Sequence, residues 1–185
     1  YDIGLDFTIL DNRITGSVGY YNRHTNDLLQ SVPLSTTSGH SSQTQNVGEV
    51  ENKGIEIELS ADVVKWGDLT WNIYTNYATN DNKVLKLAQK ADGSDINLDG
   101  FYQRTRVGEP LNVWYIRGWA GVNSDTGKAM YYKGGATDPS MEIVNSYSAA
   151  SQMVQGNRMP DYSGGLGTRF SFKGFYLDAN LYFQG

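Results

Sequence analysis

Strict alternation between apolar and polar residues is the feature that most constrains how this chain can fold. It is clearest in the stretch FYLDANLYFQG, where every second residue from Phe175 to Phe183 is apolar and the residues between them are polar or amphipathic. Successive side chains of a β-strand point to opposite faces, so this stretch predicts a strand whose two faces meet different surroundings.

The same alternation recurs in six stretches, at 1–9, 14–21, 53–63, 69–77, 162–172 and 175–185. Short turns follow the first, third and fifth stretches, whereas long connections, about 22–52 and 80–161, follow the second and fourth. Short periplasmic turns and long external loops are typical of bacterial transmembrane β-barrels, whose spanning strands need about 9 to 11 residues. We therefore predict an all-β fold, an antiparallel up-and-down transmembrane β-barrel fragment with about six wall strands, short periplasmic turns and two long extracellular loops.

The positions of the charged residues favour membrane-spanning strands. An ionised side chain that faces lipid at the bilayer midplane costs about 2 to 4 kcal/mol, and somewhat less for Asp and Glu. Among the charged residues of the six stretches, only Lys53 falls in the same alternating positions as the apolar residues. It lies at a strand end, where its ammonium group can reach the interface. The charged residues on the polar parity are Asp2, Asp6, Glu56, Glu58, Asp62, Arg169 and Asp178.

A soluble carbohydrate-binding β-sandwich remains the alternative, because its outer faces are also wet and would produce a similar alternation. Its connections, however, would not be expected to sort into short turns on one side and long loops on the other. The regular sequence of short and long connections therefore favours the barrel.

Composition excludes several classes of function. The net charge of -5 and the pI near 4.9 argue against a nucleic-acid surface, which needs clustered Lys and Arg. The chain has no Cys, and its two His residues, His24 and His40, lie in a long polar connection without the spacing of a zinc site. No run of 18 apolar residues is present, so the sequence predicts no spanning helix. We predict no cofactor and no metal.

Two acidic residues on one strand face raise the question of catalysis. Carboxylates at Glu56 and Glu58 would lie about 6.5 to 7 Å apart, within the range of a glycosidase pair. A water-filled lumen explains both acids, and nothing near them in the sequence suggests how one pKa would be raised. We predict that the chain is not an enzyme.

The segment NVGEVENKGIEIEL, from Asn46 to Leu59, resembles the Asn-x-Gly-x-x-x-Asn-Lys-Gly-Ile/Val-Glu signature of SusC/RagA-type TonB-dependent outer-membrane transporters of Bacteroidetes. The segments YDIGLDFTILDNRITGSVGYYNRHTNDLL, VGEPLNVWYIRGWAGVNSDTGKAMYY and MPDYSGGLGTRFSFKGFYLDANLYF are similar to other parts of that barrel. Glycines in the signature suit a backbone bend where the long connection enters the wall. The signature residues, expected to be structural, are Asn46, Gly48, Asn52, Lys53, Gly54, Ile55 and Glu56.

The resemblance implies that residues 1–185 are a partial TonB-dependent receptor β-barrel domain without its plug domain, within a barrel of roughly 22 strands. In this family the TonB complex acts on the plug, and a SusD-like surface lipoprotein closes over the barrel to capture oligosaccharides or, in some members, peptides. The expected location is the bacterial outer membrane, with membrane lipid against the wall. The chain begins in mid-pattern at Tyr1, which suggests a fragment that supplies wall and loops and does not transport alone.

The insertion from Asp81 to Pro160 is the candidate functional surface, because about eighty residues far exceeds an ordinary connection. Its aromatic residues suit sugar rings or a protein partner, although they would equally serve to pack a small hairpin within the loop. The expected contact residues are Trp114, Tyr115, Trp119, Tyr131 and Tyr132. The residues expected to face the lumen or the plug are Glu56, Glu58, Asn72 and Asn76.

Overall fold

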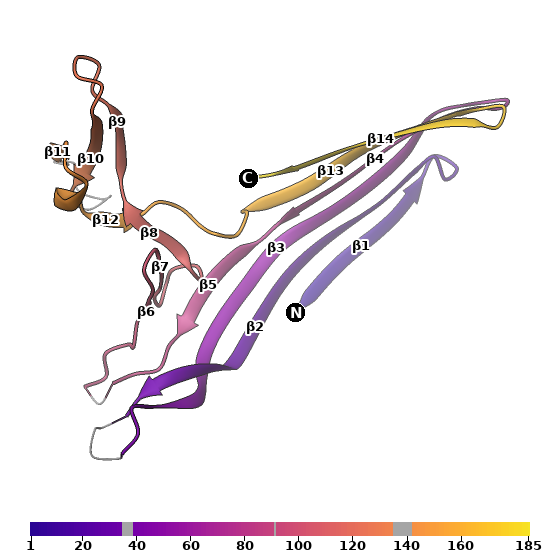
Figure 1. Ribbon diagram of the computed structural model, residues 1–185. Helices are drawn as coiled ribbons and strands as arrows, with labels where there is room; N and C mark the ends of the chain where they lie inside the picture. Colours follow the sequence, from indigo (N-terminus) through magenta and orange to yellow (C-terminus); the bar gives the residue numbers. More distant parts are fainter. Residues whose placement is uncertain (35–38, 91, 135–141) are drawn as a thin grey trace. The chain divides into compact units, whose positions relative to one another are not determined.

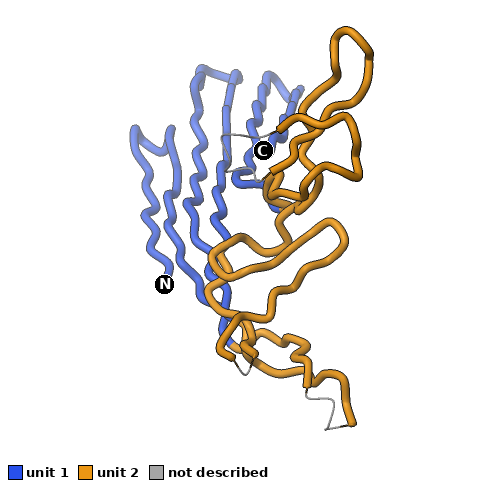
Figure 2. The backbone as a smooth tube through the Cα atoms, turned by 90° about the vertical axis from the view of Figure 1, so that its left-hand side faces the viewer, with its two compact units in different colours: residues 1–26, 49–82, 159–185 blue, residues 27–48, 83–158 orange. Residues whose placement is uncertain are grey.

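The computed structural model describes residues 1–34, 39–90, 92–134 and 142–185. Within this part the regular structure is β-strand, apart from the short 3-10 turn η2 (Tyr147–Ala149). None of the helical structure in these residues is long or apolar enough to cross a bilayer. Contacts divide the chain into two compact units, the first made of residues 1–26, 49–82 and 159–185 and the second of 27–48 and 83–158 (Figure 2).

The first unit is built on a meandering sheet with the strand order β1-β2-β3-β4-β13-β14 (Figure 1). Its strands are β1 (Asp2–Ile9), β2 (Ile14–Pro33), β3 (Ser42–Trp66), β4 (Leu69–Thr79), β13 (Tyr162–Phe172) and β14 (Phe175–Gln184). The pairs β1–β2, β3–β4, β4–β13 and β13–β14 are all antiparallel. These are the six predicted strands, so the predicted all-β, up-and-down arrangement is confirmed as an open sheet with β1 and β14 at its edges.

Cross-strand register separates an apolar from a polar face, because directly paired residues of neighbouring strands point to the same side. Ile57 pairs with Tyr77, and the next residue, Glu58, pairs with Asn76. The same separation holds in β1–β2, β4–β13 and β13–β14. The polar face carries all four residues expected to line the lumen, Glu56, Glu58, Asn72 and Asn76.

A β-bulge in β3 departs from the regular alternation that the sequence predicted up to Val63. The β3–β4 register shifts between Asp62 and Val64, which leaves Val63 as the extra residue. Such an insertion reverses the side to which the following residues point. Beyond it Val64 pairs with Trp71 and Lys65 with Thr70, so the two faces keep their character up to the turn.

The connection predicted as a long loop over 22–52 is largely strand. β2 continues to Pro33 and β3 begins at Ser42, well beyond the predicted ends near Tyr21 and Lys53. Main-chain hydrogen bonds hold a paired ribbon whatever its side chains, and a ribbon with polar residues on both faces gives no period-two signal. The predicted strand ends were therefore wrong here, while residues 35–38 of this connection lie outside the described part.

The long insertion between β4 and β13 forms small sheets. β5 (Asp81–Lys86) pairs with β3. A four-stranded sheet has the order β12-β8-β7-β6, and a three-stranded sheet has the order β11-β10-β9. The strands are β6 (Leu98–Asp99), β7 (Gln103–Thr105), β8 (Val113–Arg117), β9 (Trp119–Val122), β10 (Ala129–Lys133), β11 (Glu142–Val144) and β12 (Gln152–Val154).

A small core gives the second unit a packed interior. Its buried apolar side chains include Val84, Leu87, Val113 and Met153. The buried amide of Gln30 is satisfied on both sides, because Nε2 donates to the Ile96 carbonyl oxygen at 3.2 Å and Oε1 accepts from the Ala88 N–H at 2.9 Å. The insertion is thus a structured β-region and not an extended loop.

Replacing Leu5 by Arg tests the assignment of the two faces. Leu5 lies opposite Val18 on the apolar face and is 66% exposed, so in a bilayer its side chain would meet hydrocarbon. With the chain in its full-length protein in phospholipid vesicles, Leu5→Arg is expected to lower the free energy of unfolding by about 2 to 4 kcal/mol. Guanidinium titration measures this loss.

Asp6→Arg is the matched control, because Asp6 is the neighbouring residue on the polar face. Its expected effect on the free energy of unfolding is below about 1 kcal/mol. Equal losses for Leu5→Arg and Asp6→Arg would show that the apolar face does not meet lipid.

Candidate functional site

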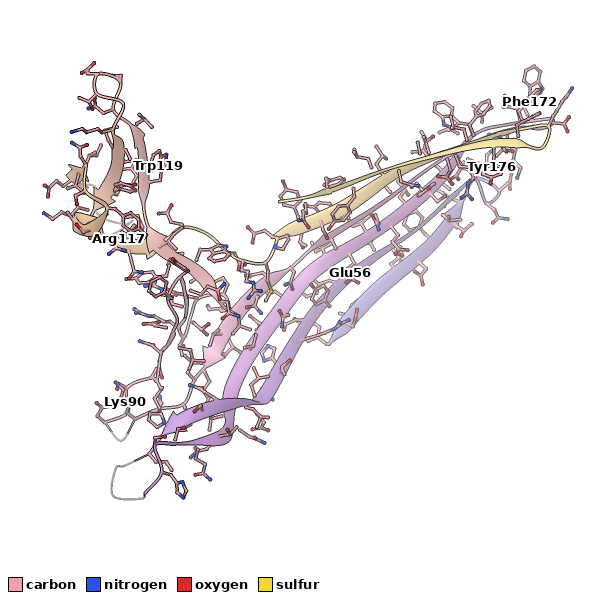
Figure 3. All side chains as sticks on the ribbon, viewed as in Figure 1. Glu56, Lys90, Arg117, Trp119, Phe172 and Tyr176 are labelled. Carbon is pink, nitrogen blue, oxygen red and sulfur yellow. The ribbon has the colours of Figure 1, made fainter. Side chains whose placement is uncertain are left out.

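The polar face of the first unit borders a hollow of about 770 Å³. Residues of all six main strands line it, so the sheet curves around this space. Glu58 and Asn76, both expected in the lumen, are among the lining residues. Glu56, labelled on β3 in Figure 3, and Asn72 lie on the same face outside that lining. A curved polar face of this kind can contact water, a plug or a passing solute.

A hydrogen-bonded network ties β4, β13 and β14 together on this face. The Tyr74 hydroxyl lies 2.8 Å from Asp178 Oδ1 and 2.7 Å from Asn180 Oδ1, two acceptors for its one proton. Arg169 Nε donates to Asp178 Oδ2 at 2.8 Å. The Tyr74 ring lies over Gly167, where a Cβ would come within 2.2 Å of ring atoms. The glycine therefore makes room for the ring that completes the network.

The acids of the polar face differ in how they are compensated. Asn72 Nδ2 donates to Asp62 Oδ1 at 2.9 Å and lies 3.0 Å from Ser60 Oγ. The side-chain carboxylates of Asp6 and Glu58, by contrast, make no hydrogen bond or ion pair within the part of the chain that the structure describes. Among these residues, some acids of the wall are thus internally paired and others are not.

The Asn-Lys-Gly-Ile-Glu signature lies within β3, and its glycine has a packing role. A Cβ at Gly54 would lie 1.9 Å from the Thr79 carbonyl oxygen and 2.8 Å from the Tyr21 hydroxyl oxygen. That hydroxyl lies 3.1 Å from the same carbonyl oxygen and 3.0 Å from Asn80 Oδ1. The chain leaves β4 here to enter the insertion, so Gly54 permits a tight joint at the exit.

Other signature residues support the same joint. Asn82 Nδ2 donates to Asn52 Oδ1 at 2.7 Å, and Lys53 Nζ lies 3.3 Å from Asp81 Oδ2. The Ile55 N–H donates to Thr79 Oγ1 at 3.0 Å.

The remaining signature residues have separate surroundings. A Cβ at Gly48 would lie 3.1 Å from the Leu28 Cβ, so close packing inside a continuous strand explains both glycines better than the expected bend. Asn46 and Glu56 are exposed.

The five aromatic residues expected to form one contact surface lie in different surroundings. Trp114 and Tyr115 are consecutive in β8 and therefore point to opposite faces of their sheet. Tyr131 and Tyr132 are likewise consecutive in β10. Trp119, at the start of β9, is the cross-strand partner of Tyr131.

Three rings pack together where β9 meets β10. Trp119 and Tyr131 have ring centroids 5.6 Å apart at 79°, and Tyr147 adds a third ring 5.4 Å from Tyr131 at 77°. We call these three residues the aromatic cluster. This geometry fits the alternative that the rings pack a small hairpin within the insertion. Trp119 and Tyr147 nevertheless remain 54% and 52% exposed. Tyr147 was not among the residues predicted from the sequence, because it lies in η2, where no periodic pattern marks it.

Three arginines of the second unit are placed in contrasting ways. Arg104 forms a bidentate ion pair with Glu109 and stacks 4.4 Å from the Tyr115 ring centroid. Arg106 donates to Asp99 at 3.0 Å, and this hydrogen bond raises the pKa of the guanidinium. Arg117 lies 4.5 Å from the centroid of the Tyr147 ring.

Comparison with known proteins gives consistent results along the whole chain. A family described as "TonB dependent receptor-like, beta-barrel" matches residues 1–184. TonB-dependent receptor P3 of Formosa agariphila is 36% identical over 201 residues, covering 99% of this chain and 19% of the relative. TonB-dependent receptor SusC of Bacteroides thetaiotaomicron is 34% identical over 127 residues, covering 63% of this chain and 13% of SusC.

Solved structures agree with these relatives. The RagAB peptide importer in its "open-open" state matches with a TM-score of 0.80 and 28% identity, covering 99% of this chain and 20% of the importer chain. A structure of the RagAB peptide transporter matches with a TM-score of 0.78 at the same identity, covering 98% and 20%. The chain thus spans about a fifth of the length of these proteins.

Replacing Gly54 by Ala tests the joint between β3 and β4. The added methyl group would overlap the Thr79 carbonyl, so Gly54→Ala is expected to lower the free energy of unfolding by about 1 to 3 kcal/mol. Gly4→Ala is the control, because the nearest atom to a Cβ at Gly4 is the Val18 carbonyl oxygen at 3.8 Å. Denaturant titration of the two variants should show a loss only for Gly54→Ala.

Replacing Tyr131 by Ala tests whether the aromatic cluster holds its hairpin together. The change removes two ring pairs, each worth about 0.5 to 1.5 kcal/mol, so amide hydrogen exchange in β9 and β10 is expected to accelerate. Trp114→Ala, which removes an exposed ring of β8, should leave that exchange unchanged. Unchanged protection in Tyr131→Ala would mean that the rings do not stabilise the hairpin.

Proposed function

The chain belongs to the SusC/RagA-type TonB-dependent receptors, and from this premise we propose that it is a wall-and-loop segment of an outer-membrane transporter that imports nutrients. The observation that carries the proposal is the curved antiparallel sheet with one apolar and one polar face. A soluble β-sandwich requires two packed sheets, whereas the first unit has a single sheet with an exposed apolar face.

Aromatic residues at both ends of the apolar face support a location in the outer membrane. At one end, ring pairs join neighbouring strands, Tyr1 with Tyr20 at 6.1 Å and Tyr77 with Tyr162 at 6.2 Å. At the turn end, large exposed rings gather near Phe172, which Figure 3 labels. Amphipathic rings at both rims of an apolar band are typical of transmembrane barrels.

The polar face is proposed to line the lumen and to contact the plug domain of the complete protein. Glu56, Glu58, Asn72 and Asn76 are the residues proposed for this role, and their shared face and the adjoining hollow support it. TonB would act through the plug domain of the complete protein.

The second unit is proposed to meet the substrate and a SusD-like surface lipoprotein. The proposed contact residues are Trp114, Tyr115, Trp119, Tyr131 and Tyr132. Partly exposed rings such as Trp119 support this role, since aromatic faces suit both sugars and protein partners. Oligosaccharides are the proposed cargo, and the likeness to RagAB, a peptide importer, makes peptides the second candidate.

No enzymatic role is proposed, because the relatives are receptors and transporters. Glu56 and Glu58 serve the wall in this proposal. Asn76, the cross-strand partner of Glu58, is a neutral amide, so the directly paired position supplies no second carboxylate.

Fractionation and uptake test the transport proposal together. In the native bacterium, the full-length protein should be extracted from the outer membrane only with detergent, and its deletion should abolish uptake of at least one labelled oligosaccharide or peptide. An uncoupler that collapses the proton gradient should stop uptake while surface binding persists. Recovery of the full-length protein in the soluble fraction, or uptake that continues unchanged in the presence of the uncoupler, would contradict the proposal.

A further inference from the structure

We infer that Arg117 and the aromatic cluster form a binding site for an acidic sugar, a ring that carries a carboxylate or sulfate group. The inference rests on the proposed transport function and narrows its substrate class. All four residues, Arg117, Trp119, Tyr131 and Tyr147, belong to the second unit.

The charge of Arg117 is uncompensated in the described part of the chain. Arg104 and Arg106 each have a carboxylate partner, whereas the guanidinium of Arg117 has neither an ion pair nor a hydrogen bond there. Its Nε is buried and has no hydrogen-bond partner. Neither of its two terminal nitrogens is buried in this way without a partner. A partly buried guanidinium of this kind favours an anionic ligand that can accept two parallel N–H bonds.

The local fold holds Arg117 in place. It ends β8, pairs with Gln152 of β12, and stacks 4.5 Å from the Tyr147 ring centroid. The next residue, Gly118, packs so closely that a Cβ there would lie 2.5 Å from the Met153 sulfur. The arginine is therefore presented by a packed backbone and an aromatic ring, which lowers the entropy lost when a ligand binds.

The aromatic cluster supplies the second half of the site. Trp119 follows Arg117 by two residues at the junction of β8 and β9, where Figure 3 labels both. Trp119 and Tyr147 each leave about half of their surface exposed while Tyr131 fixes both rings edge to face. A ring face beside a guanidinium matches a sugar ring that bears an anionic substituent.

Sugar and peptide ligands would use this site in different ways. β8 pairs with β12 at Tyr115, Ile116 and Arg117, and with β7 only at Val113 and Trp114. A peptide would bind through main-chain hydrogen bonds to an open strand edge, whereas an acidic sugar would bind through its charged group and its ring. The ring faces beside the guanidinium favour the sugar, and a peptide with a free carboxylate is the competing outcome of the test.

Calorimetry on the full-length transporter, purified in detergent, tests this site. The probes are trisaccharides of galacturonate and of mannuronate, a sulfated galactose trisaccharide, and the neutral galactose and mannose trisaccharides. We expect at least one acidic probe to bind about tenfold tighter than its neutral counterpart. Arg117→Gln should abolish that preference, and Arg117→Lys should restore part of it.

Matched controls separate the site from general electrostatics. Trp119→Ala should weaken acidic and neutral probes alike, because it removes a ring face from both. Arg158→Gln removes an exposed arginine of the same unit and should change nothing. Raising the NaCl concentration with the unmutated protein should weaken only the acidic probes, a readout that does not depend on whether a variant folds.

Three results would overturn the inference. They are no preference for any acidic probe, an unchanged preference in Arg117→Gln, or tighter Arg117-dependent binding of a tetrapeptide with a free carboxylate. Uptake assays distinguish a failure of the acidic-sugar inference from a failure of the transport proposal. Normal uptake of a neutral sugar or a peptide would leave the transporter in place and remove only the acidic-sugar site.

Discussion

Main-chain hydrogen bonding between neighbouring strands is the constraint on which the rest of this structure depends. Inside hydrocarbon an unpaired N–H or C=O group has no water to bind, so a spanning strand must be paired along its length. Once six strands are paired, their registers fix which side chains face lipid and which face the interior. The bulge at Val63 and the close joint at Gly54 are local departures that this pairing accommodates.

Alternation of apolar and polar residues made the wall predictable from sequence, because each spanning strand has one face toward lipid and one toward the polar interior. β13 and β14 coincide with their predicted ranges almost residue for residue. The same reasoning failed beyond Tyr21 in β2, since polar residues on both faces erase the signal while the hydrogen bonds persist. It also missed the bulge, because Val63 and Val64 are both apolar and either one suits the lipid face.

The candidate sites were less predictable, because they depend on contacts between residues distant in sequence. The signature around Gly54 was identified by resemblance, but its packing against Thr79 and Tyr21 required the paired strands. Tyr147 joins Trp119 and Tyr131 only after the insertion has folded. That Arg117 has no acidic partner in the described residues is likewise invisible in a sequence whose other arginines look the same.

The charges of the two units bear on how an acidic cargo would be handled. The polar face of the wall carries the carboxylates of Asp6 and Glu58, which have no side-chain partner among the described residues and would repel an anionic ligand. At the proposed site the attraction would come from the second unit, where Arg117, whose guanidinium has no carboxylate partner among the described residues, lies against a ring face. Under the proposed transport function, an acidic cargo would therefore be held at the second unit and would bind only weakly along the wall.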